Sequence, residues 1–288
     1  MREPIKSAGA STAPFVPPRY WDTVAEQWRW FGPPLRPCAE DARIMENAVE
    51  RWAEAVRGRK LRALLLGVTP EITTMRWPPR TDLVAVDRST EMMGCVWPGD
   101  MPGMRRAVRG DWLALPIADG ACDVVVGDGV LTPLAYADGW VTFAQSLRRV
   151  LRPGGLLVMR TFTQGARRET VGQVLQDLKD GCVGSVHVLK WRLAMALQED
   201  ARSGVRVADV WRAWECAASD GGPPGGPAGW RAEEVRTLAM YRNNLERRFF
   251  PTLEETRRIF DPAFEEIATV LPGYELGDRC PTLAYRAR

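Results

Sequence analysis

Two kinds of apolar spacing alternate along the middle of the chain. Short apolar runs that end in turn or acidic residues predict strands, at 61–67, 82–87, 104–111, 122–128 and 154–162. Between the last two runs, residues 139–155 have helical spacing and close on Arg-Pro-Gly-Gly. Buried strands that alternate with helices predict a parallel sheet with right-handed crossovers, an α/β architecture.

Helical spacing also flanks this series. Apolar residues recur at helical intervals over 39–56, after a short aromatic helix that ends at residues 32–34. Beyond the fifth strand, residues 168–218 are helical in period, 219–229 have the composition of a linker, and a helix resumes from Trp230 to about Phe250. These helices predict a lid inserted after the fifth strand.

The C-terminal part returns to the sheet. Thr252 and Glu255 form a capping-box signature for a short helix that ends near Asp261. Residues 264–273 and 280–288 then predict two final strands, paired as an antiparallel hairpin. We therefore expect an N-terminal tail with cap helices over 1–58, of which 1–18 is a disordered tail. A Rossmann-like domain over 59–164 and 251–288 and a substrate-binding lid over 165–250 complete the division.

Composition narrows the class of partner. Of the 288 residues, 45% are hydrophobic and 26% are charged, as in an ordinary globular protein, and the net charge is +3. The basic residues form no long run, which disfavours nucleic acid, and no apolar stretch is long enough for a membrane. The N-terminus lacks the apolar core of a signal peptide, so we expect a cytoplasmic protein.

Cysteine and histidine usage bears on metal chemistry. The six cysteines include no C-x-x-C pair, and the single histidine, His187, excludes a site with two histidine ligands. We therefore expect no metal centre. His187 is the one histidine available for a catalytic role, although its place in a predicted lid helix favours a structural role.

The spacing of the first two strands indicates a cofactor site. Gly67 follows the first strand, and Asp87 ends the second strand 20 residues later. In a doubly wound sheet these residues lie side by side at the carboxyl edge, where a ribose can bind between backbone donors and an acid. This spacing alone is compatible with NAD, FAD or S-adenosylmethionine.

Three consecutive segments, VAVDRSTEMM, GDWLALPIADGACDVVV and LRRVLRPGGLLVM, sharpen this picture. In this order they resemble the motifs of class I S-adenosylmethionine-dependent methyltransferases, over residues 60–162 and the final strand pair. The resemblance implies a mostly parallel seven-stranded sheet with an antiparallel C-terminal edge. It also implies S-adenosylmethionine as cofactor, S-adenosylhomocysteine as product and methyl transfer to a small molecule.

The resemblance assigns the first two strand ends to the methionine and ribose parts of the cofactor. Gly67 would let the loop approach the methionine part closely. Asp87, followed by Arg88, would hold the ribose hydroxyls, and Met92 would pack on the adenine. From the residues alone, a strand-ending turn remains a lesser alternative for Asp87, and core packing is an equal alternative for Met92.

The next two strand ends complete the implied site. Gly110 and Asp111 follow the third strand, and Asp111 would accept a hydrogen bond from the adenine amino group. Trp112 would pack nearby. Asp128 and Gly129 would face the sulfonium and the substrate, which makes Asp128 a candidate catalytic residue. A turn role for Asp111 and a core role for Trp112 remain open.

The first loop departs from the family pattern. Leu65 stands where the family usually has an acidic residue, so it cannot neutralise the methionine ammonium. Glu71 is the predicted replacement, and Thr69 offers a hydroxyl and a backbone amide. A carboxylate at a helix start also interacts favourably with the helix dipole, so a structural role for Glu71 remains open.

The predicted lid and cap helices are rich in aromatic residues. Seven of the 12 tryptophans lie there, at positions 21, 28, 30, 191, 211, 214 and 230. They predict an aromatic-walled pocket for an aromatic or cationic small molecule. Tyr20, Tyr241 and His187 are further candidate catalytic residues, and a homodimer is compatible with the sequence.

Three other functions compete with methyl transfer. The altered first loop is compatible with an enzyme that cyclises S-adenosylmethionine or transfers another group from it. A NAD-dependent oxidoreductase is disfavoured because the G-x-G-x-x-G pattern is absent. A protein that keeps the fold and binds the cofactor without catalysis remains a further alternative.

Overall fold

The computed structural model describes residues 19–56, 59–219 and 229–288, and a seven-stranded sheet forms its centre. Across the sheet, the strands lie in the order β3 (Arg105–Arg109), β2 (Asp82–Asp87), β1 (Arg62–Leu66), β4 (Cys122–Asp128), β5 (Leu151–Arg160), β9 (Thr282–Ala287) and β8 (Phe264–Val270). The first five are parallel, and β9 pairs antiparallel with both β5 and β8. This arrangement confirms the predicted fold class and the C-terminal strand pair.

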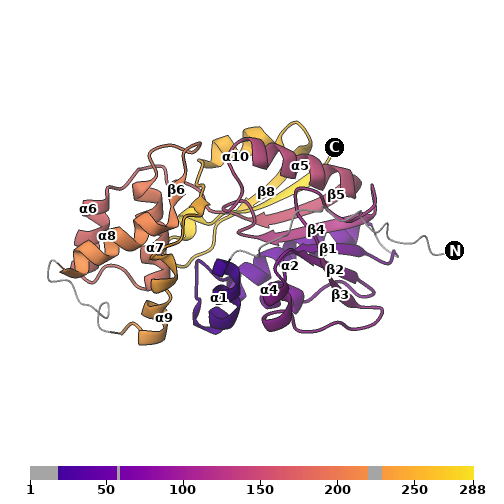
Figure 1. Cartoon of the computed structure of the whole chain (residues 1–288). Helices are drawn as coiled ribbons and strands as arrows, with labels where there is room; N and C mark the ends of the chain where they lie inside the picture. The colour runs from indigo at the N-terminus through magenta and orange to yellow at the C-terminus, as the bar shows by residue number, and fades with distance from the viewer. Residues whose placement is uncertain (1–18, 57–58, 220–228) are drawn as a thin grey trace, which may run out of the picture.

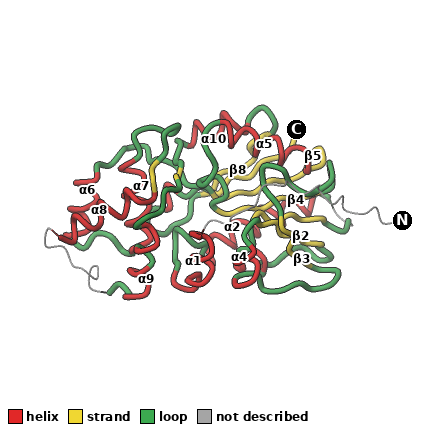
Figure 2. The backbone as a smooth tube through the Cα atoms, in the orientation of Figure 1, coloured by secondary structure: helices red, strands yellow, loops and turns green. Residues whose placement is uncertain are grey.

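Helices cover both faces of the sheet (Figure 2). One face packs against α1 (Arg19–Gln27), η1 (Trp28–Trp30), α2 (Ala39–Ala55), α3 (Pro70–Thr73) and α4 (Thr90–Cys95), and the other against α5 (Asp138–Val150) and α10 (Leu253–Phe260). Strand β1 shows why: Leu65 points into the first apolar cluster, whereas Leu64 and Leu66 point into the second. A strand buried on both faces needs the continuous apolar run that the sequence carries there.

The lid helices lie between β5 and α10 in the sequence and gather beyond one end of the sheet (Figure 1). They are α6 (Val171–Lys179), α7 (Val186–Leu197), α8 (Val207–Ser219) and α9 (Ala232–Arg236), followed by η2 (Ala239–Tyr241). An apolar cluster of their own includes Trp191, Trp214 and Phe250, and Phe162 joins it just after β5. The lid therefore packs against the edge of the sheet where the parallel strands end.

The predicted helix from Trp230 to Phe250 is wrong. Only α9 and η2 are helical there, and β7 (Arg247–Arg248) pairs with β6 (Val205–Arg206). The Asn244 side chain accepts the Glu246 N–H at 2.8 Å, a local turn that competes with helix formation. The extended segment after it carries Phe249, whose N–H donates to the Thr132 carbonyl at 3.0 Å.

The predicted helical region over 168–218 is interrupted by non-helical segments and by β6, and the other predicted segments differ mainly at their ends. Strand β5 begins at Leu151, earlier than the predicted residue 154, with an irregular register opposite Cys122 and Val124. The predicted capping box of α10 is present, with Thr252 and Glu255 bonded reciprocally. Before β9, the short helix η3 (Gly277–Arg279) closes the β8–β9 connection.

The predicted tail over 1–18 and most of the linker lie outside the described residues. In the described ranges, no helix combines the length and apolarity that a membrane span requires.

Candidate active site

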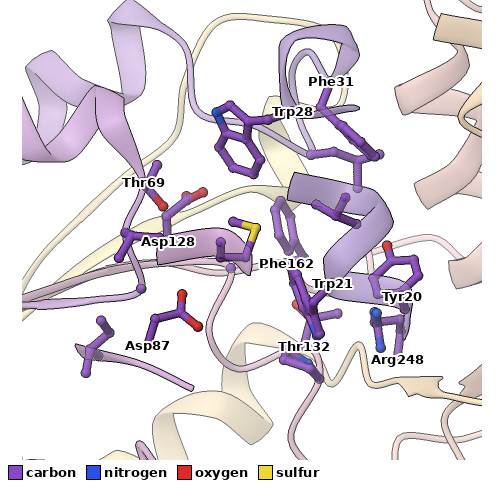
Figure 3. A pocket seen from close by; sticks show the side chains of 18 of the residues that line it. Tyr20, Trp21, Trp28, Phe31, Thr69, Asp87, Asp128, Thr132, Phe162 and Arg248 are labelled. Carbon is purple, nitrogen blue, oxygen red and sulfur yellow. The ribbon is translucent and has the colours of Figure 1, made fainter. Parts of the chain in front are cut away.

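A cavity lies where the carboxyl ends of the strands meet α1 and the lid (Figure 3). Its described walls come from the β1 loop, the ends of β2 and β4, and the segments after β3 and β5. Of the predicted site residues, those that line it are Gly67, Thr69, Asp87, Met92, Trp112, Asp128, Gly129 and Tyr20. The structure thus brings together eight of the predicted site residues in one cavity.

Gly67 lies close to Thr69, Asp87 and Trp112. Its φ is +91°, and its N–H donates to the Val86 carbonyl at 2.8 Å, which ties the loop to β2. A Cβ on Gly67 would lie 3.7 Å from both Asp87 Oδ2 and the Trp112 ring. Only glycine adopts this φ without strain and leaves that space open for a ligand. The glycine therefore leaves open the space between the loop, Asp87 and Trp112.

Asp87 ends β2 with its carboxyl group almost enclosed, since the residue is 9% exposed. Oδ1 accepts the Ser89 N–H at 2.9 Å, and Ser89 in turn caps α4 by accepting the Met92 N–H. Burial raises the pKa of Asp87 to about 6, and the Ser89 N–H opposes this rise. A ligand that donates hydroxyl groups would replace the lost hydration and stabilise the charged form.

Trp112 is fixed beside this carboxylate, because its indole N–H donates to the Val86 carbonyl at 2.7 Å. Gly110 permits the close packing of this segment, since a Cβ there would lie 2.7 Å from Pro116. Asp111 and Arg88 are exposed and lie outside the cavity lining. Asp111 Oδ1 caps its own turn by accepting the Leu113 N–H, so its adenine contact stays a prediction.

Asp128 lines the cavity but is engaged by a buried arginine. Arg160, at the end of β5, donates from Nε to Oδ1 at 2.5 Å and from its terminal nitrogen to Oδ2 at 3.1 Å. Arg160 also contacts Asp41 Oδ2 at 3.3 Å and Tyr274 at 2.7 Å, and the Tyr274 hydroxyl donates to Asp41. Burial raises the pKa of Asp128, and the paired guanidinium opposes the rise. Asp128 is therefore part of a fixed ionic network and not a free base.

The β1 loop ends in a second ion pair. Two nitrogens of the Arg36 guanidinium each lie 2.5 Å from Glu71 Oε1. The same guanidinium lies 5.3 Å from the Trp28 ring centre. Glu71 is not among the lining residues, but within the described residues its Oε2 is buried without a hydrogen-bond partner. The indole N–H of Trp28, which does line the cavity, is also unpartnered. One acceptor and one donor thus remain unused beside the loop.

Tyr241 and His187, predicted as catalytic, lie outside the cavity lining and are almost fully buried. His187 Nε2 lies 3.0 Å from the Trp30 carbonyl, and its ring stacks on Phe31. Burial lowers the pKa of His187 to about 3 and raises that of Tyr241 well above its usual value. Neither group is placed or tuned as a base, because both serve as packing contacts between the lid and the N-terminal segment.

Lys190 completes this contact and was not predicted from the sequence. Its ammonium lies 5.0 Å from the ring centres of both Phe31 and Tyr241 and donates to Thr237 Oγ1 at 2.5 Å. Burial lowers its pKa well below the usual value. The lid therefore holds the segment after α1 through a lysine between two aromatic rings.

Sequence reasoning missed four further residues of the site, namely Arg160, Thr132, Phe162 and Arg248. Arg160 ends an otherwise apolar strand, which is the same signal that singled out Asp87 and Asp128. Arg248 does not end a predicted strand, because its segment was expected to be helical. Of the seven tryptophans predicted for the aromatic walls, Trp21, Trp28 and Trp191 line the cavity, and those at positions 30, 211, 214 and 230 do not.

Comparisons with known proteins bear on the fold and on the family of part of the chain. Residues 66–159 match the family model described as a methyltransferase domain. A search of curated proteins gave no match. CurJ carbon methyltransferase shares 15% identity at a TM-score of 0.50, covering 93% of this chain and 59% of that chain. A putative Zn-dependent alcohol dehydrogenase from Rhodobacter sphaeroides shares 10% identity at a TM-score of 0.58, covering 94% and 98%.

N-methyltransferase NodS from Bradyrhizobium japonicum WM9, solved with S-adenosylhomocysteine, shares 13% identity at a TM-score of 0.48, covering 92% of this chain and 98% of that chain. At these identities, structural similarity defines only the fold, which is the class I Rossmann-like one. The family match assigns residues 66–159, about a third of the chain, to a methyltransferase domain.

The residues present fit S-adenosylmethionine. Gly67 leaves a cradle beside Asp87 and Trp112, which suits a ribose and a purine. The unpartnered Trp28 N–H and Glu71 Oε2 suit the carboxylate and the ammonium of an amino acid end.

Proposed function

We propose that the protein methylates a small molecule inside a pocket closed by the lid. One observation carries this proposal: the strand-end residues and the aromatic side chains of α1 and the lid line the same cavity. Trp21 comes from α1 and Trp191 from α7, and both reach the cavity that Asp87 and Gly129 line. Such an enclosed, largely apolar site suits a small acceptor.

In this proposal, the ends of β1, β2 and β4 hold S-adenosylmethionine. Gly67 and Thr69 contact its methionine part, Asp87 accepts the ribose hydroxyls, and Met92 and Trp112 pack on the adenine. Glu71 Oε2 accepts the ammonium and the Trp28 N–H binds the carboxylate. When bound, the cofactor supplies an electrophilic methyl group for in-line displacement, with S-adenosylhomocysteine as product.

The chain's own residues then align the acceptor and exclude water. Alignment contributes up to about 7–11 kcal/mol in ideal cases. Gly129 has a φ of +62°, and a Cβ there would lie 3.0 Å from the Phe162 ring, so glycine keeps the end of β4 open toward the acceptor. The lid over 165–250 and the cap helices supply the remaining walls. Asp128, held by Arg160, positions this edge and does not take a proton in this scheme.

Titration calorimetry with S-adenosylhomocysteine and product analysis test the proposal. We expect saturable binding, and S-adenosylhomocysteine as the cofactor product when small aromatic acceptors are supplied with S-adenosylmethionine. Methylthioadenosine in its place would indicate transfer of another group from the cofactor. No binding at millimolar S-adenosylhomocysteine would overturn the assignment of the site.

A further inference from the structure

The cavity has two halves of different chemistry, and in Figure 3 Asp87 lies on the opposite side of the view from Tyr20 and Arg248. We call Gly67, Thr69, Asp87, Met92 and Trp112 the cofactor half. We call Tyr20, Trp21, Thr132, Phe162, Trp191 and Arg248 the acceptor half. The proposed function leaves the second half for the methyl acceptor, and the polar groups found there restrict what that acceptor can be.

Arg248 is the only cation among the described lining residues, and it is 5% exposed. Its guanidinium lies 5.0 Å from the Tyr20 ring centre and 6.0 Å from that of Trp21. Among the described residues, its two terminal nitrogens donate to Glu246 Oε2 and to the Arg247 carbonyl, each at 3.0 Å. A guanidinium carries five N–H donors, so donors remain for a ligand in the cavity.

Two more buried polar atoms of the acceptor half lack partners within the described residues. Thr132 is 3% exposed and its hydroxyl is unpartnered, and Trp191 is 5% exposed with an unpartnered indole N–H. Buried polar groups are normally hydrogen-bonded, and an unmet donor costs free energy. Because the indole and the guanidinium only donate, the missing partner must supply acceptor atoms.

The backbone holds these groups close to one another. The Thr132 carbonyl accepts the N–H of Phe249, the residue after Arg248, at 3.0 Å. The Trp191 ring lies 5.1 Å from that of Phe250 and 5.3 Å from that of Phe162. Arg248 therefore belongs to the segment 248–250, and Thr132 and Trp191 both contact this segment.

We propose that the methyl acceptor is a small aromatic carboxylic acid. Its carboxylate binds Arg248 and the Thr132 hydroxyl, since arginine recognises carboxylates through paired, charge-assisted hydrogen bonds. Its ring packs against Trp21 and Phe162. Of the aromatic and cationic acceptors that the sequence left open, a cation is disfavoured because the Trp191 N–H and the remaining N–H groups of Arg248 can only donate hydrogen bonds. This inference rests on the proposed function, which supplies the cofactor half.

The test compares acids with their uncharged amides on the full chain saturated with S-adenosylhomocysteine. The probes are benzoate, 4-hydroxybenzoate and indole-3-carboxylate, each paired with its primary amide and titrated by calorimetry. We expect at least one acid to bind about tenfold or more tightly than its amide, as the loss of a charged hydrogen bond implies. If no acid binds more tightly than its amide, the proposed acceptor class is wrong.

Arg248→Met should reduce the affinity for the acid to that of the amide and leave S-adenosylhomocysteine affinity unchanged. The control is Arg242→Met, because Arg242 also lies over an aromatic ring, 5.4 Å from that of Trp211, and pairs with Glu215, but is exposed outside the cavity. It should leave both affinities unchanged. An unaltered preference for the acid in Arg248→Met would overturn the inference.

A second variant covers the case in which Arg248→Met does not fold. Thr132→Val keeps the side-chain shape, removes the hydroxyl, and should weaken acid binding about threefold to tenfold. Unchanged acid binding in this variant contradicts the proposed carboxylate site. If S-adenosylhomocysteine does not bind at all, the proposed function fails, and the acid–amide comparison without it decides the present inference separately.

Discussion

The two halves of the cavity are built in different ways. The cofactor half comes from consecutive strand ends between residues 67 and 112, so the sheet's parallel register places its members side by side. The acceptor half is drawn from α1, the segments after β4 and β5, α7 and β7, which span most of the described chain. The first half follows from backbone topology, and the second depends on how the lid packs.

The halves also differ in hydrogen-bonding character. Asp87 gives the cofactor half a buried acceptor with a raised pKa, whereas Arg248, Thr132 and Trp191 give the acceptor half donors. The ligand of the cofactor half must therefore donate hydrogen bonds, and the ligand of the acceptor half must accept them. Each variant below should affect one half, or the junction between them, in a distinguishable way.

The largest effect is expected at the junction. Arg160 holds Asp128 and Asp41, and its guanidinium lies 5.2 Å from the Phe162 ring centre. Arg160→Met leaves two buried carboxylates unpaired and should lower the free energy of unfolding by about 3–5 kcal/mol. Urea unfolding measures this loss. The control Arg258→Met removes an exposed pair with Glu254 and should leave the free energy of unfolding almost unchanged.

An Arg160→Met protein as stable as the control would contradict the role of the network. We further expect S-adenosylhomocysteine and the aromatic acids both to bind more weakly to this variant. Loss of binding to one half alone would show that the network supports only that half.

The next effect belongs to the cofactor half. Asp87→Ala should weaken S-adenosylhomocysteine binding by about 1–3 kcal/mol, because a buried charged acceptor is lost. Binding of the aromatic acid probes should be unchanged. The matched control is Asp82→Ala, at the other end of β2, where the carboxylate pairs with Lys60 and Arg106. Calorimetry that shows equal losses for the two variants would remove Asp87 from the site.

Asp87 also predicts a pH dependence that the acceptor half lacks. Its folded pKa of about 6 lies above the usual 3.8, so its contribution to folding stability is complete at low pH and is lost as the pH rises through about 6. Cofactor binding needs the charged form and should change in the opposite direction, weakening as the pH falls from 7 to 5.

Calorimetry at several pH values, with Asp87→Asn as control, measures this dependence. We expect the variant to show a flat profile for S-adenosylhomocysteine, and the wild-type chain to show a flat profile for the aromatic acids. A flat wild-type profile for S-adenosylhomocysteine would indicate that Asp87 does not change its charge on binding.

The cofactor half could be predicted from the sequence to a much greater extent than the acceptor half. The spacing of Gly67 and Asp87 encodes the cofactor half, because a strand, a glycine turn and an acid at the next strand end leave little geometric freedom. The interpretation of Leu65 also agrees with the structure, where its side chain is fully buried in the apolar core. In contrast, Arg248 was missed because Asn244 ends a helical pattern through a side-chain turn.

The lid shows why candidate catalytic residues are harder to predict. His187 and Tyr241 have the right chemistry and lie near the N-terminal segment, as the lid prediction implies. Their exposure and partners depend on tertiary packing, and the Trp30 carbonyl takes up His187 Nε2. A single reactive side chain on a helix therefore shows less about a site than a polar residue that ends a buried strand.

The smallest expected effect concerns Glu71, the predicted replacement for the missing acid at Leu65. Oε1 is neutralised by Arg36, so only Oε2 remains for the cofactor ammonium. Glu71→Gln should weaken S-adenosylhomocysteine binding by about 0.5–1.5 kcal/mol, the net contribution of one hydrogen bond.

Arg36→Met separates the two roles of Glu71, because it removes the partner and keeps the carboxylate. If Oε2 binds the ammonium, this variant retains or strengthens S-adenosylhomocysteine binding, since Glu71 is no longer neutralised. If the ion pair only anchors the segment after α1, both variants should weaken binding equally. Unequal responses of the two partners would therefore assign Glu71 to the cofactor half, and equal responses would assign it to the fold.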